Sequence, residues 1–260
     1  MITRYRVWLD EVALDSLADS IYITDIQEME PEMEIHTMSV LGGNGTSVTH
    51  QRRISLQIRV SFQIREYNIA TRREVFNKIM TWAQGTVLYT NERDGQQINV
   101  QLDAPPAMSA LKWTETLTLS FTAWENPYWI SNDATMLTLS GESVSGEITV
   151  DGNTACYPMF VVSNTGAAPI NTVTITAGEN RVRLEGINML PEGYVYFSSH
   201  NGSGALSPFM IDDNGIRYLD NCFSDDSDDS LPVIGGVPTT ILATADGEMT
   251  FIVLAQGVWL

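Results

Sequence analysis

The sequence predicts a mainly β protein of the α+β class, with one helix and two β-rich halves. The first observation is the segment from Arg53 to Arg65, in which apolar and polar residues alternate without a break. The second is a single helical pattern over residues 71–83. The third is that residues 131–260 hold short strand-like runs separated by turn residues. We therefore expect a β-sandwich or split barrel with a flanking helix, followed by an all-β sandwich.

The alternating segment is expected to be a long strand with one buried face. A period of two places successive side chains on opposite faces of a strand. The apolar face comprises Ile54, Leu56, Ile58, Val60, Phe62 and Ile64. The polar face includes Arg53, Arg59 and Arg65. At about 3.3 Å per residue the segment spans roughly 40 Å, so we expect it to reach beyond its own domain.

The helix is expected to begin at a capping box formed by Thr71 and Glu74. In this motif the hydroxyl accepts from the third amide of the helix and the carboxylate accepts from the cap residue. Apolar residues then recur at helical spacing, namely Val75, Phe76, Ile79, Met80 and Ala83. Gly85 stands where glycine commonly ends a helix.

Three more strands are expected in the first half. Residues 86–90 and 97–103 flank Asp94-Gly95, a dipeptide typical of tight hairpins. Residues 114–124 alternate again between apolar and hydroxyl side chains. The order after the long strand is therefore helix, hairpin and strand.

The chain is acidic, and its second half is the more acidic one. The 260 residues carry 14 Lys and Arg against 32 Asp and Glu, for a net charge of −18. Residues 1–130 hold eleven basic and sixteen acidic residues and a net charge of −5, whereas residues 131–260 hold three and sixteen and a net charge of −13. A protein that binds duplex nucleic acid needs a basic footprint, so specific nucleic-acid binding is not expected.

The change in composition predicts a domain boundary. We expect residues 1–130 to form one domain, residues 131–151 to be a linker and residues 152–260 to form a β-sandwich. No apolar run reaches the length of a membrane span, and the first residues lack the apolar core of a signal peptide. Cys156 and Cys222 have no paired spacing. We therefore expect no membrane insertion, no disulfide framework and synthesis in a cytoplasm-like compartment.

The sequence offers little catalytic or metal-binding chemistry. The three histidines, His36, His50 and His200, match no ligand or catalytic pattern, and there is no nucleophile elbow and no phosphate-binding lysine motif. The aspartates between residues 225 and 229 lack the register of an EF-hand loop, which favours a solvated acidic loop. We expect no enzyme, no cofactor and no metal site.

Aromatic residues in the second half leave a sugar-binding role open. They are Tyr194, Tyr196, Phe197, Phe209 and Tyr218. Alternation places Tyr194 and Tyr196 on one face of a strand and Val195 and Phe197 on the other. One of these faces must belong to the core, and the other is free to meet a ligand.

A surface for self-association is expected in the first half. The Gly-rich segment from Leu41 to Val48 has no lysine and predicts a mobile loop that could order against a neighbouring subunit. Candidate interface residues are therefore Gly42, Gly43, Asn44, Arg53, Arg59 and Arg65. The acidic segment from Glu28 to Glu34 is expected to pair with these arginines across the subunit boundary.

The order of these elements resembles the distal tail protein of long-tailed siphophages. The resemblance rests on the long strand, the helix, the Asp94-Gly95 hairpin and the closing pattern Phe121-x-x-Trp124-x-Asn126-Pro127-Tyr128. In the second half it rests on Tyr157-Pro158-x-Phe160-Val161-Val162-x-Asn164-x-Gly166 and the strands that follow.

The resemblance implies a fold, a function and a set of partners. It implies a tail-tube-like first domain that forms a hexameric ring with a channel for DNA, and a galectin-like second domain. The implied partners are the tail tube protein, the tail-associated hub or lysin protein and the tape measure protein. The implied location is the tail tip of a virion assembled in the cytoplasm of a bacterial host. Two alternatives stay open: another tail-tube or baseplate ring subunit, and a module that binds host-surface polysaccharide.

Overall fold

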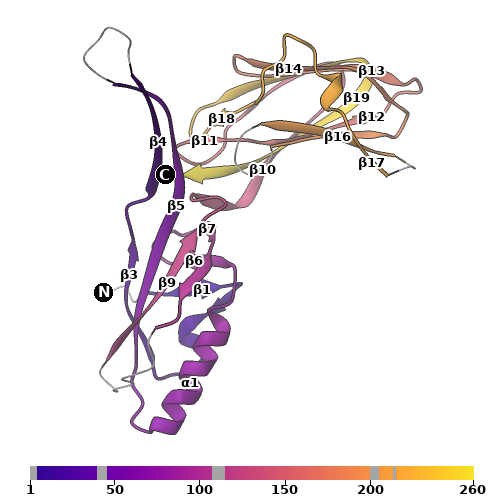
Figure 1. The fold of residues 1–260 in the computed structure, drawn as a ribbon. Coiled ribbons are helices and arrows are strands. Elements are labelled where there is room, and N and C mark those ends of the chain that lie inside the picture. The colour runs from indigo at the N-terminus through magenta and orange to yellow at the C-terminus, as the bar shows by residue number, and fades with distance from the viewer. Residues whose placement is uncertain (1–4, 40–45, 107–114, 200–204, 213–214) are drawn as a thin grey trace. The chain divides into compact units, whose positions relative to one another are not determined.

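The chain folds into two compact units, Met1–Trp129 and Ile130–Leu260, in a computed structural model (Figure 1). The structure describes residues 5–39, 46–106, 115–199, 205–212 and 215–260. Each unit is built from antiparallel strands, and one α-helix lies in the first unit. The predicted fold class, mainly β with one helix, is therefore confirmed.

The first unit contains two antiparallel sheets. The larger sheet has the order β3-β5-β9-β8, and β4 pairs with β5 outside this order. Its strands are β3 (Ile21–Glu28), β4 (Glu32–Ser39), β5 (Thr46–Ile64), β8 (Gln101–Ala104) and β9 (Thr116–Ala123). The smaller sheet has the order β7-β6-β1-β2, made of β1 (Val7–Leu9), β2 (Val12–Ala13), β6 (Val87–Thr90) and β7 (Gln96–Asn99). A short 3-10 turn, Leu14–Ser16, follows β2.

Strand β5 has the two faces that its alternation predicts. Leu56, Ile58, Val60, Phe62 and Ile64 are buried, whereas Ile54 is only half-buried. The strand is longer than predicted, because it already begins at Thr46 and takes in the last three residues of the expected loop, Thr46 to Val48. The remainder of that loop, residues 41–45, lies outside the described residues.

Helix α1 (Ile69–Trp82) packs on the apolar face of the larger sheet. The helix buries Val75, Phe76, Ile79 and Trp82, which follow the predicted spacing. The Trp82 ring meets Phe121 of β9 edge-on at 6.3 Å between centroids, and its Nε1 donates to the Val12 carbonyl at 2.7 Å. One side chain thus ties the helix to both sheets.

The helix begins earlier than predicted. Its cap is Asn68, whose Oδ1 accepts from the amides of Ala70 and Thr71 at 2.8 and 3.4 Å. Thr71 therefore lies inside the first turn, and the predicted capping box with Glu74 is wrong. The turn before the helix is held by the buried Arg72, whose Nε donates to the Glu66 carbonyl at 2.8 Å. This contact fixes where the chain enters the helix.

The cap gives a direct test of the helix start. Asn68→Ala is expected to destabilise the helix by about 1 kcal/mol, because two amides of the first turn lose their acceptor. Thr71→Ala should change stability by less than about 0.5 kcal/mol, since its side chain is exposed and does not cap the helix. Hydrogen exchange of the α1 amides measures both. A larger loss of stability from Thr71→Ala than from Asn68→Ala would show that Thr71, and not Asn68, caps the helix.

The hairpin between β6 and β7 forms at the predicted turn. Leu88 is opposite Ile98, and Gly95 adopts φ 72°, which glycine tolerates best. The single strand predicted over residues 97–103 is wrong, because it is split at Val100. Strand β7 belongs to the smaller sheet and β8 to the larger one, so the chain changes sheets at this residue.

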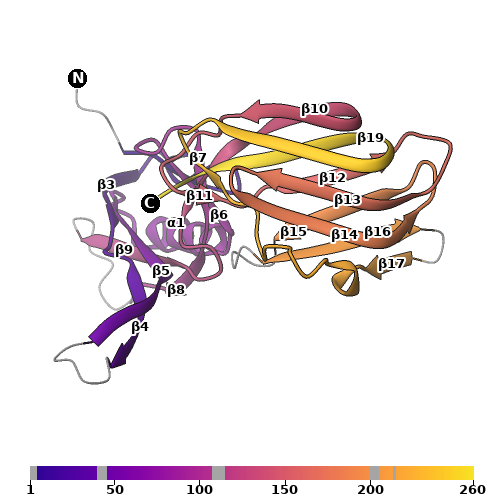
Figure 2. The same cartoon turned by 90° about the horizontal axis from the view of Figure 1, so that it is seen from above.

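The second unit is a β-sandwich whose strands run side by side in Figure 2. One sheet has the order β17-β16-β15-β12-β19-β10, and β13 joins β14 to another part of β19. The strands are β10 (Trp129–Ile148), β12 (Met159–Asn164), β13 (Ile170–Ala177), β14 (Asn180–Met189), β15 (Tyr194–Ser199), β16 (Leu206–Asp212), β17 (Gly215–Tyr218) and β19 (Thr239–Trp259). A separate two-stranded sheet pairs β11 (Ala155–Cys156) with β18 (Val233–Ile234), and Asp220–Cys222 form a second 3-10 turn.

Strand β19 connects the two sheets of the sandwich. Its residues 241–245 pair with β13, and its residues 249–254 pair with β12. Two of the short strand-like runs predicted for the second half, residues 238–243 and 248–254, lie here. The structure has one strand, because both runs stay extended while the pairing partner changes.

The predicted linker over residues 131–151 is also mostly strand. Residues up to Ile148 belong to β10, which pairs with β19. Leu137 and Leu139 pack against the core, and the Ser131 Oγ accepts from the Gly257 amide at 2.8 Å. From the sequence this segment is expected to be a linker, because its apolar residues alternate with small polar residues, which are common in loops.

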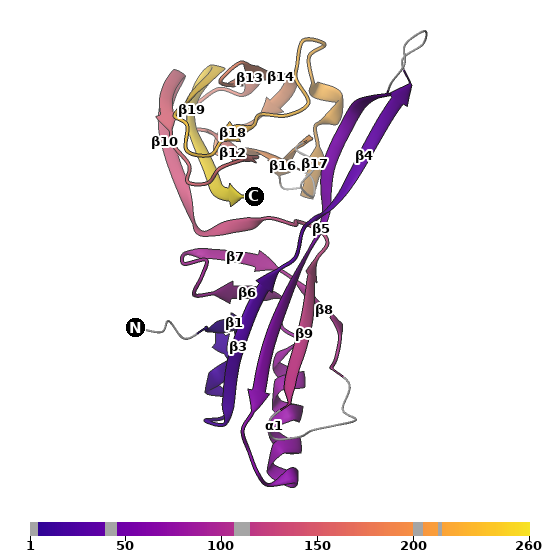
Figure 3. The same ribbon diagram turned by 90° about the vertical axis from the view of Figure 1, so that its left-hand side faces the viewer.

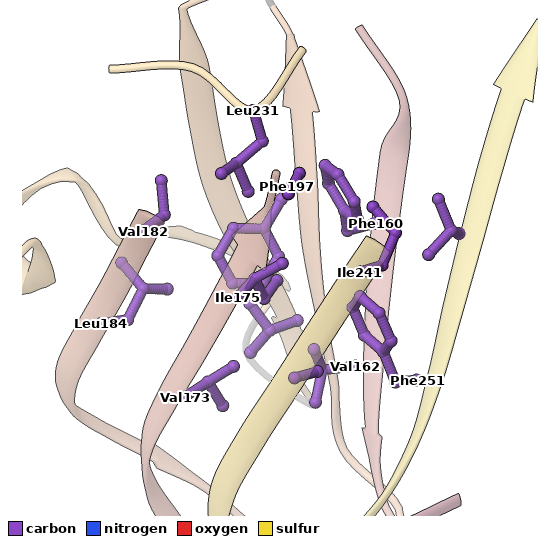
Figure 4. Packing of buried hydrophobic residues seen from close by; sticks show 14 of the residues in the cluster. Phe160, Val162, Val173, Ile175, Val182, Leu184, Phe197, Leu231, Ile241 and Phe251 are labelled. Atoms are coloured by element: carbon purple, nitrogen blue, oxygen red, sulfur yellow. The ribbon is translucent and has the colours of Figure 1, made fainter. Parts of the chain in front are cut away.

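The core of the second unit is apolar and contains stacked phenylalanine rings. Figure 4 shows Phe160, Phe197 and Phe251 among aliphatic side chains from both sheets. The rings of Phe160 and Phe251 lie 6.0 Å apart and within 9° of parallel. Cys156 belongs to the same core cluster, and its burial raises the pKa of its thiol to about 11.

Candidate assembly surface

A two-stranded arm extends from the first unit (Figure 3). We define the arm as β4 together with residues 46–55 of β5. Strand β9 pairs with β5 only from Leu56 onward, and β3 only from Ile58 onward. Within the described residues, the arm strands therefore pair only with each other. A two-stranded ribbon is marginally stable by itself, and its open edges invite pairing with another chain.

One face of the arm carries exposed apolar side chains. Met33 is 37% exposed and Ile35 is 53% exposed. These two apolar residues alternate with Glu32 and Glu34 along β4. Met33 and Ile35 therefore share one face of the arm, and the two glutamates share the other. Covering large apolar side chains with a partner removes their surface from water and gives a favourable free energy of association.

The other face of the arm holds an ionic cluster. The Arg52 Nε donates to Glu34 Oε2, and the His36 Nε2 lies 3.1 Å from Glu34 Oε1. The hydrogen bond from Arg52 is the main reason why the pKa of Glu34 lies below its usual value. The Ser55 hydroxyl donates to Glu32 at 3.1 Å. These contacts tie β4 to β5.

The three arginines predicted for the interface are spread along β5 and form no cluster. The Arg53 guanidinium lies 5.3 Å from the centre of the Tyr128 ring. The Arg59 Nε donates to the Gln57 side chain at 3.0 Å, and Arg65 stacks on Tyr22 at 4.1 Å.

The glycine-rich half of the predicted interface cannot be placed. Gly42, Gly43 and Asn44 lie outside the described residues. An interface role for these residues and for the three arginines stays a prediction.

Two of the acidic residues expected to meet those arginines, Glu28 and Glu34, form ion pairs within the chain. Glu28 accepts two hydrogen bonds of 2.9 Å from Arg93, whose guanidinium also lies 5.6 Å from the centre of the Trp129 ring. Glu34 is held by Arg52. Within the chain, the partners of Glu28 and Glu34 are thus Arg93 and Arg52. Pairing of the segment with Arg53, Arg59 or Arg65 of a neighbouring subunit stays a prediction.

The solvent face of the larger sheet is a network of hydroxyl and amide groups. The Ser61 and Thr118 hydroxyls lie 3.1 Å apart, and Gln63 donates to Thr116 at 3.2 Å. Gln57 and Thr122 both donate to Asp103, at 3.0 and 2.7 Å. The face thus satisfies its own polar groups and exposes few large apolar side chains.

In the second unit, the acidic loop is bound to a strand. Asp228 accepts from the Arg181 amide at 2.6 Å, and Asp226 accepts from the Arg181 side chain at 3.1 Å. The Ser224 hydroxyl and then Arg181 lower the pKa of Asp226. Throughout the described ranges no three His, Cys, Asp or Glu residues are grouped as metal ligands. None of the described helices is long and apolar enough to cross a membrane.

The predicted division of the aromatic residues is confirmed at β15. Val195 and Phe197 are fully buried, whereas Tyr194 is 45% exposed on the opposite face. Tyr196, Phe209 and Tyr218 continue from Tyr194 as a row of ring contacts.

Comparison with known proteins identifies the fold. No family model and no curated protein matches the sequence. The structure of the Dit protein of phage SPP1, described as a paradigm of the hub adsorption apparatus in phages that infect Gram-positive bacteria, aligns with 98% of this chain and 99% of its own. The TM-score is 0.67 at 10% sequence identity. The chain has the fold of a distal tail protein.

Two structures of a phage P2 baseplate in its activated conformation, with Ca and with Sr, also align with this chain. They cover 97% and 96% of it at 6% identity, with TM-scores of 0.43 and 0.44, and 98% and 97% of their own chains. The predicted resemblance to distal tail proteins is confirmed at the level of the fold by the SPP1 protein, whose coverage includes both units. Within the distal tail fold, the arm and the larger sheet belong to the first unit.

Proposed function

We propose that this protein is a structural component of a phage tail tip, a distal tail protein that forms a hexameric ring. The fold it shares with SPP1 Dit over nearly the whole of both chains carries this proposal. The six-fold symmetry comes from the family resemblance of the sequence. In the proposed assembly, the first unit forms the ring, and the ring joins the tail tube protein to the hub or lysin protein below it.

The arm is the feature that favours assembly through the first unit. A cyclic ring is built from heterologous contacts, in which one surface of a subunit meets a different surface of the next. The arm has exposed apolar side chains, and within the described residues no third strand pairs with its two strands. Covering Met33 and Ile35 with a neighbour would remove apolar surface from water and stabilise the ribbon.

The larger sheet supplies a wall for a channel in this proposal. Helix α1 covers its apolar face, so a ring closed around this sheet would turn the polar face toward the axis. That face carries hydroxyls and amides together with Arg59, Arg65 and Asp103, and no dense basic patch is present among its described residues. DNA binds proteins chiefly by counterion release at clustered basic groups, so such a wall would let DNA pass without holding it.

The remaining parts of the proposal follow from this role. The protein would be non-catalytic, would reside in the virion tail tip and would be assembled in the cytoplasm of the bacterial host. The tape measure protein is a further proposed partner. Another tail-tube or baseplate ring subunit is the alternative, and it differs in its neighbours rather than in ring formation.

Assembly of the full-length protein tests the proposal. We expect closed six-fold rings in negative-stain images and a matching mass in light scattering. The double variant Met33→Ser, Ile35→Ser should lower ring formation at least about tenfold, because it removes the apolar contact while the arm's polar face is unchanged. Ile69→Ser is the matched control: it changes an isoleucine that is also exposed, but on α1, and should assemble normally.

The arginines provide a second arm of this experiment. The sequence predicts that Arg59→Glu weakens assembly more than folding, with a dependence on salt. If Arg59→Glu abolishes rings and the Met33, Ile35 double variant does not, the subunit contact lies on the polar face of the larger sheet rather than on the arm. A full-length protein that stays monomeric at high concentration would contradict the proposed ring.

A further inference from the structure

A row of aromatic rings crosses the outer face of the second unit. It runs from Tyr194 and Tyr196 on β15 to Phe209 on β16 and Tyr218 on β17. Tyr196 is directly opposite Phe209, and Phe209 is directly opposite Tyr218. Successive ring centroids lie 6.3, 5.1 and 6.4 Å apart. The row therefore spans three neighbouring strands without interruption.

The row is not part of the core. The intervening residues Val195, Phe197 and Met210 point into the sandwich and are buried. The rings at the two ends of the row are open to solvent, with Tyr194 45% exposed and Tyr218 66% exposed. Cross-strand stacking accounts for Tyr196 and Phe209, whose rings lie within 13° of parallel. It does not account for two large tyrosines left uncovered at the ends.

Polar groups of the right kind border the row. One pair of residues further along the same strands, and on the same face, Ser198 is opposite Ser207. On the other side, Tyr194 is opposite Ile211, which is also exposed. Three of the four rings end in a phenol hydroxyl. Aromatic surface with a few hydroxyl groups beside it is the composition of a ligand site that both stacks and orients.

The charge of the unit restricts the ligand. The residues from 131 onward carry a net charge of −13, and none of the four ring positions or the two serines is basic. Polyanions such as nucleic acid and phosphate-rich polymers are repelled by such a surface. Among the ligands that such a surface does not repel, a neutral polysaccharide offers both apolar ring faces for the tyrosines and hydroxyls for the serines.

We propose that the row from Tyr194 to Tyr218 is a binding site for neutral glycan. Sugar rings present C–H groups that pack against aromatic faces, while their hydroxyls bond to the bordering serine and tyrosine hydroxyls. The exposed end rings provide the stacking faces, and the stacked inner pair holds them at a fixed separation. The site is independent of ring assembly and adds glycan recognition to the proposed structural role.

Titration of the full-length protein with defined oligosaccharides tests the site. The probes are the neutral hexasaccharides of β-1,4-linked glucose and of β-1,4-linked N-acetylglucosamine, with calorimetry and saturation-transfer NMR as readouts. We expect saturable binding of at least one probe, unchanged between low and high salt because the ligand is neutral. Tyr218→Ala and Tyr194→Ala should each weaken it about tenfold.

Matched variants show whether sugar binding depends on this row of rings. Tyr67→Ala removes a tyrosine that is 77% exposed in the first unit and should bind like the unchanged protein. Hydrogen exchange of the buried β15 amides should match in all variants, which shows that the sandwich is intact. Absence of binding by both probes at about 10 mM overturns the proposal. So does equal binding by the tyrosine variants, or a preference for poly(glycerol phosphate) or a basic amphipathic peptide over both sugars.

Discussion

Replacing Phe160 by alanine is expected to cost the second unit about 3–5 kcal/mol of unfolding free energy. The ring is fully buried, stacks on Phe251 and is opposite Phe197 across the sheet. Its removal leaves a cavity between side chains that come from different strands and cannot all move inward. A loss of this size is a large part of the stability of an ordinary domain.

Hydrogen exchange is the suitable measurement, because it reports each unit separately. Amides of β12, β15 and β19 should lose protection, whereas those of α1 should be unaffected. Met159→Ala is the matched control: its side chain is adjacent in the strand but 36% exposed on the outer face, and we expect a loss below about 1 kcal/mol. Equal losses in the two variants would mean that Phe160 is not in the core.

Ile79→Ala is expected to destabilise the first unit by about 2–5 kcal/mol. Ile79 is fully buried on the stripe of α1 that covers the larger sheet. Deleting its side chain opens a cavity under the helix, where the neighbouring Phe76 and Trp82 are already fixed by their own packing.

The adjacent residue provides the control for this second prediction. Lys78 is exposed and forms only a surface ion pair with Glu74 at 3.6 Å. Lys78→Ala should therefore cost about 0.5 kcal/mol or less. Urea unfolding followed by tryptophan fluorescence, which includes the signal of Trp82, distinguishes the two. An unfolding curve that Ile79→Ala leaves unchanged would contradict the placement of the helix.

The strand faces and the helix stripe were predictable because both depend on local periodicity. The alternation in β5 assigns Ile58, Val60 and Phe62 to the core, and the structure confirms it. The helix start was not predictable in the same way. Asn68 and Thr71 are both good caps, and the choice is made by Arg72, which holds the preceding turn through the Glu66 carbonyl.

The pairing of strands was much less accessible. Residues 97–103 look like one strand, yet they contribute to two sheets, while residues 238–254 look like two strands and form part of one. Strands β16 and β17 were not predicted at all, although Phe209 and Tyr218 stand out in the sequence as aromatic residues. An extended segment carries little local information about which distant strand will pair with it.

The two candidate surfaces, the arm and the row of rings, were also predictable only where they depend on local alternation. The alternation of Met33 and Ile35 with glutamates was visible in the sequence, but their exposure depends on where β3 and β9 stop pairing with β5. The split between Tyr194 and Phe197 was visible too. Its continuation to Phe209 and Tyr218 exists only because β16 and β17 come next to β15.

The sequence by itself determined the buried faces of the long strand and of the helix, and the resemblance to distal tail proteins. These depend on spacing along the chain, which the geometry of helices and strands fixes locally. The tertiary structure alone decided the extent of the arm, the ion pairs of Glu28 and Glu34, and the row of rings on the sandwich. Each of these depends on register between segments far apart in sequence, where a shift of one residue moves every side chain to the opposite face.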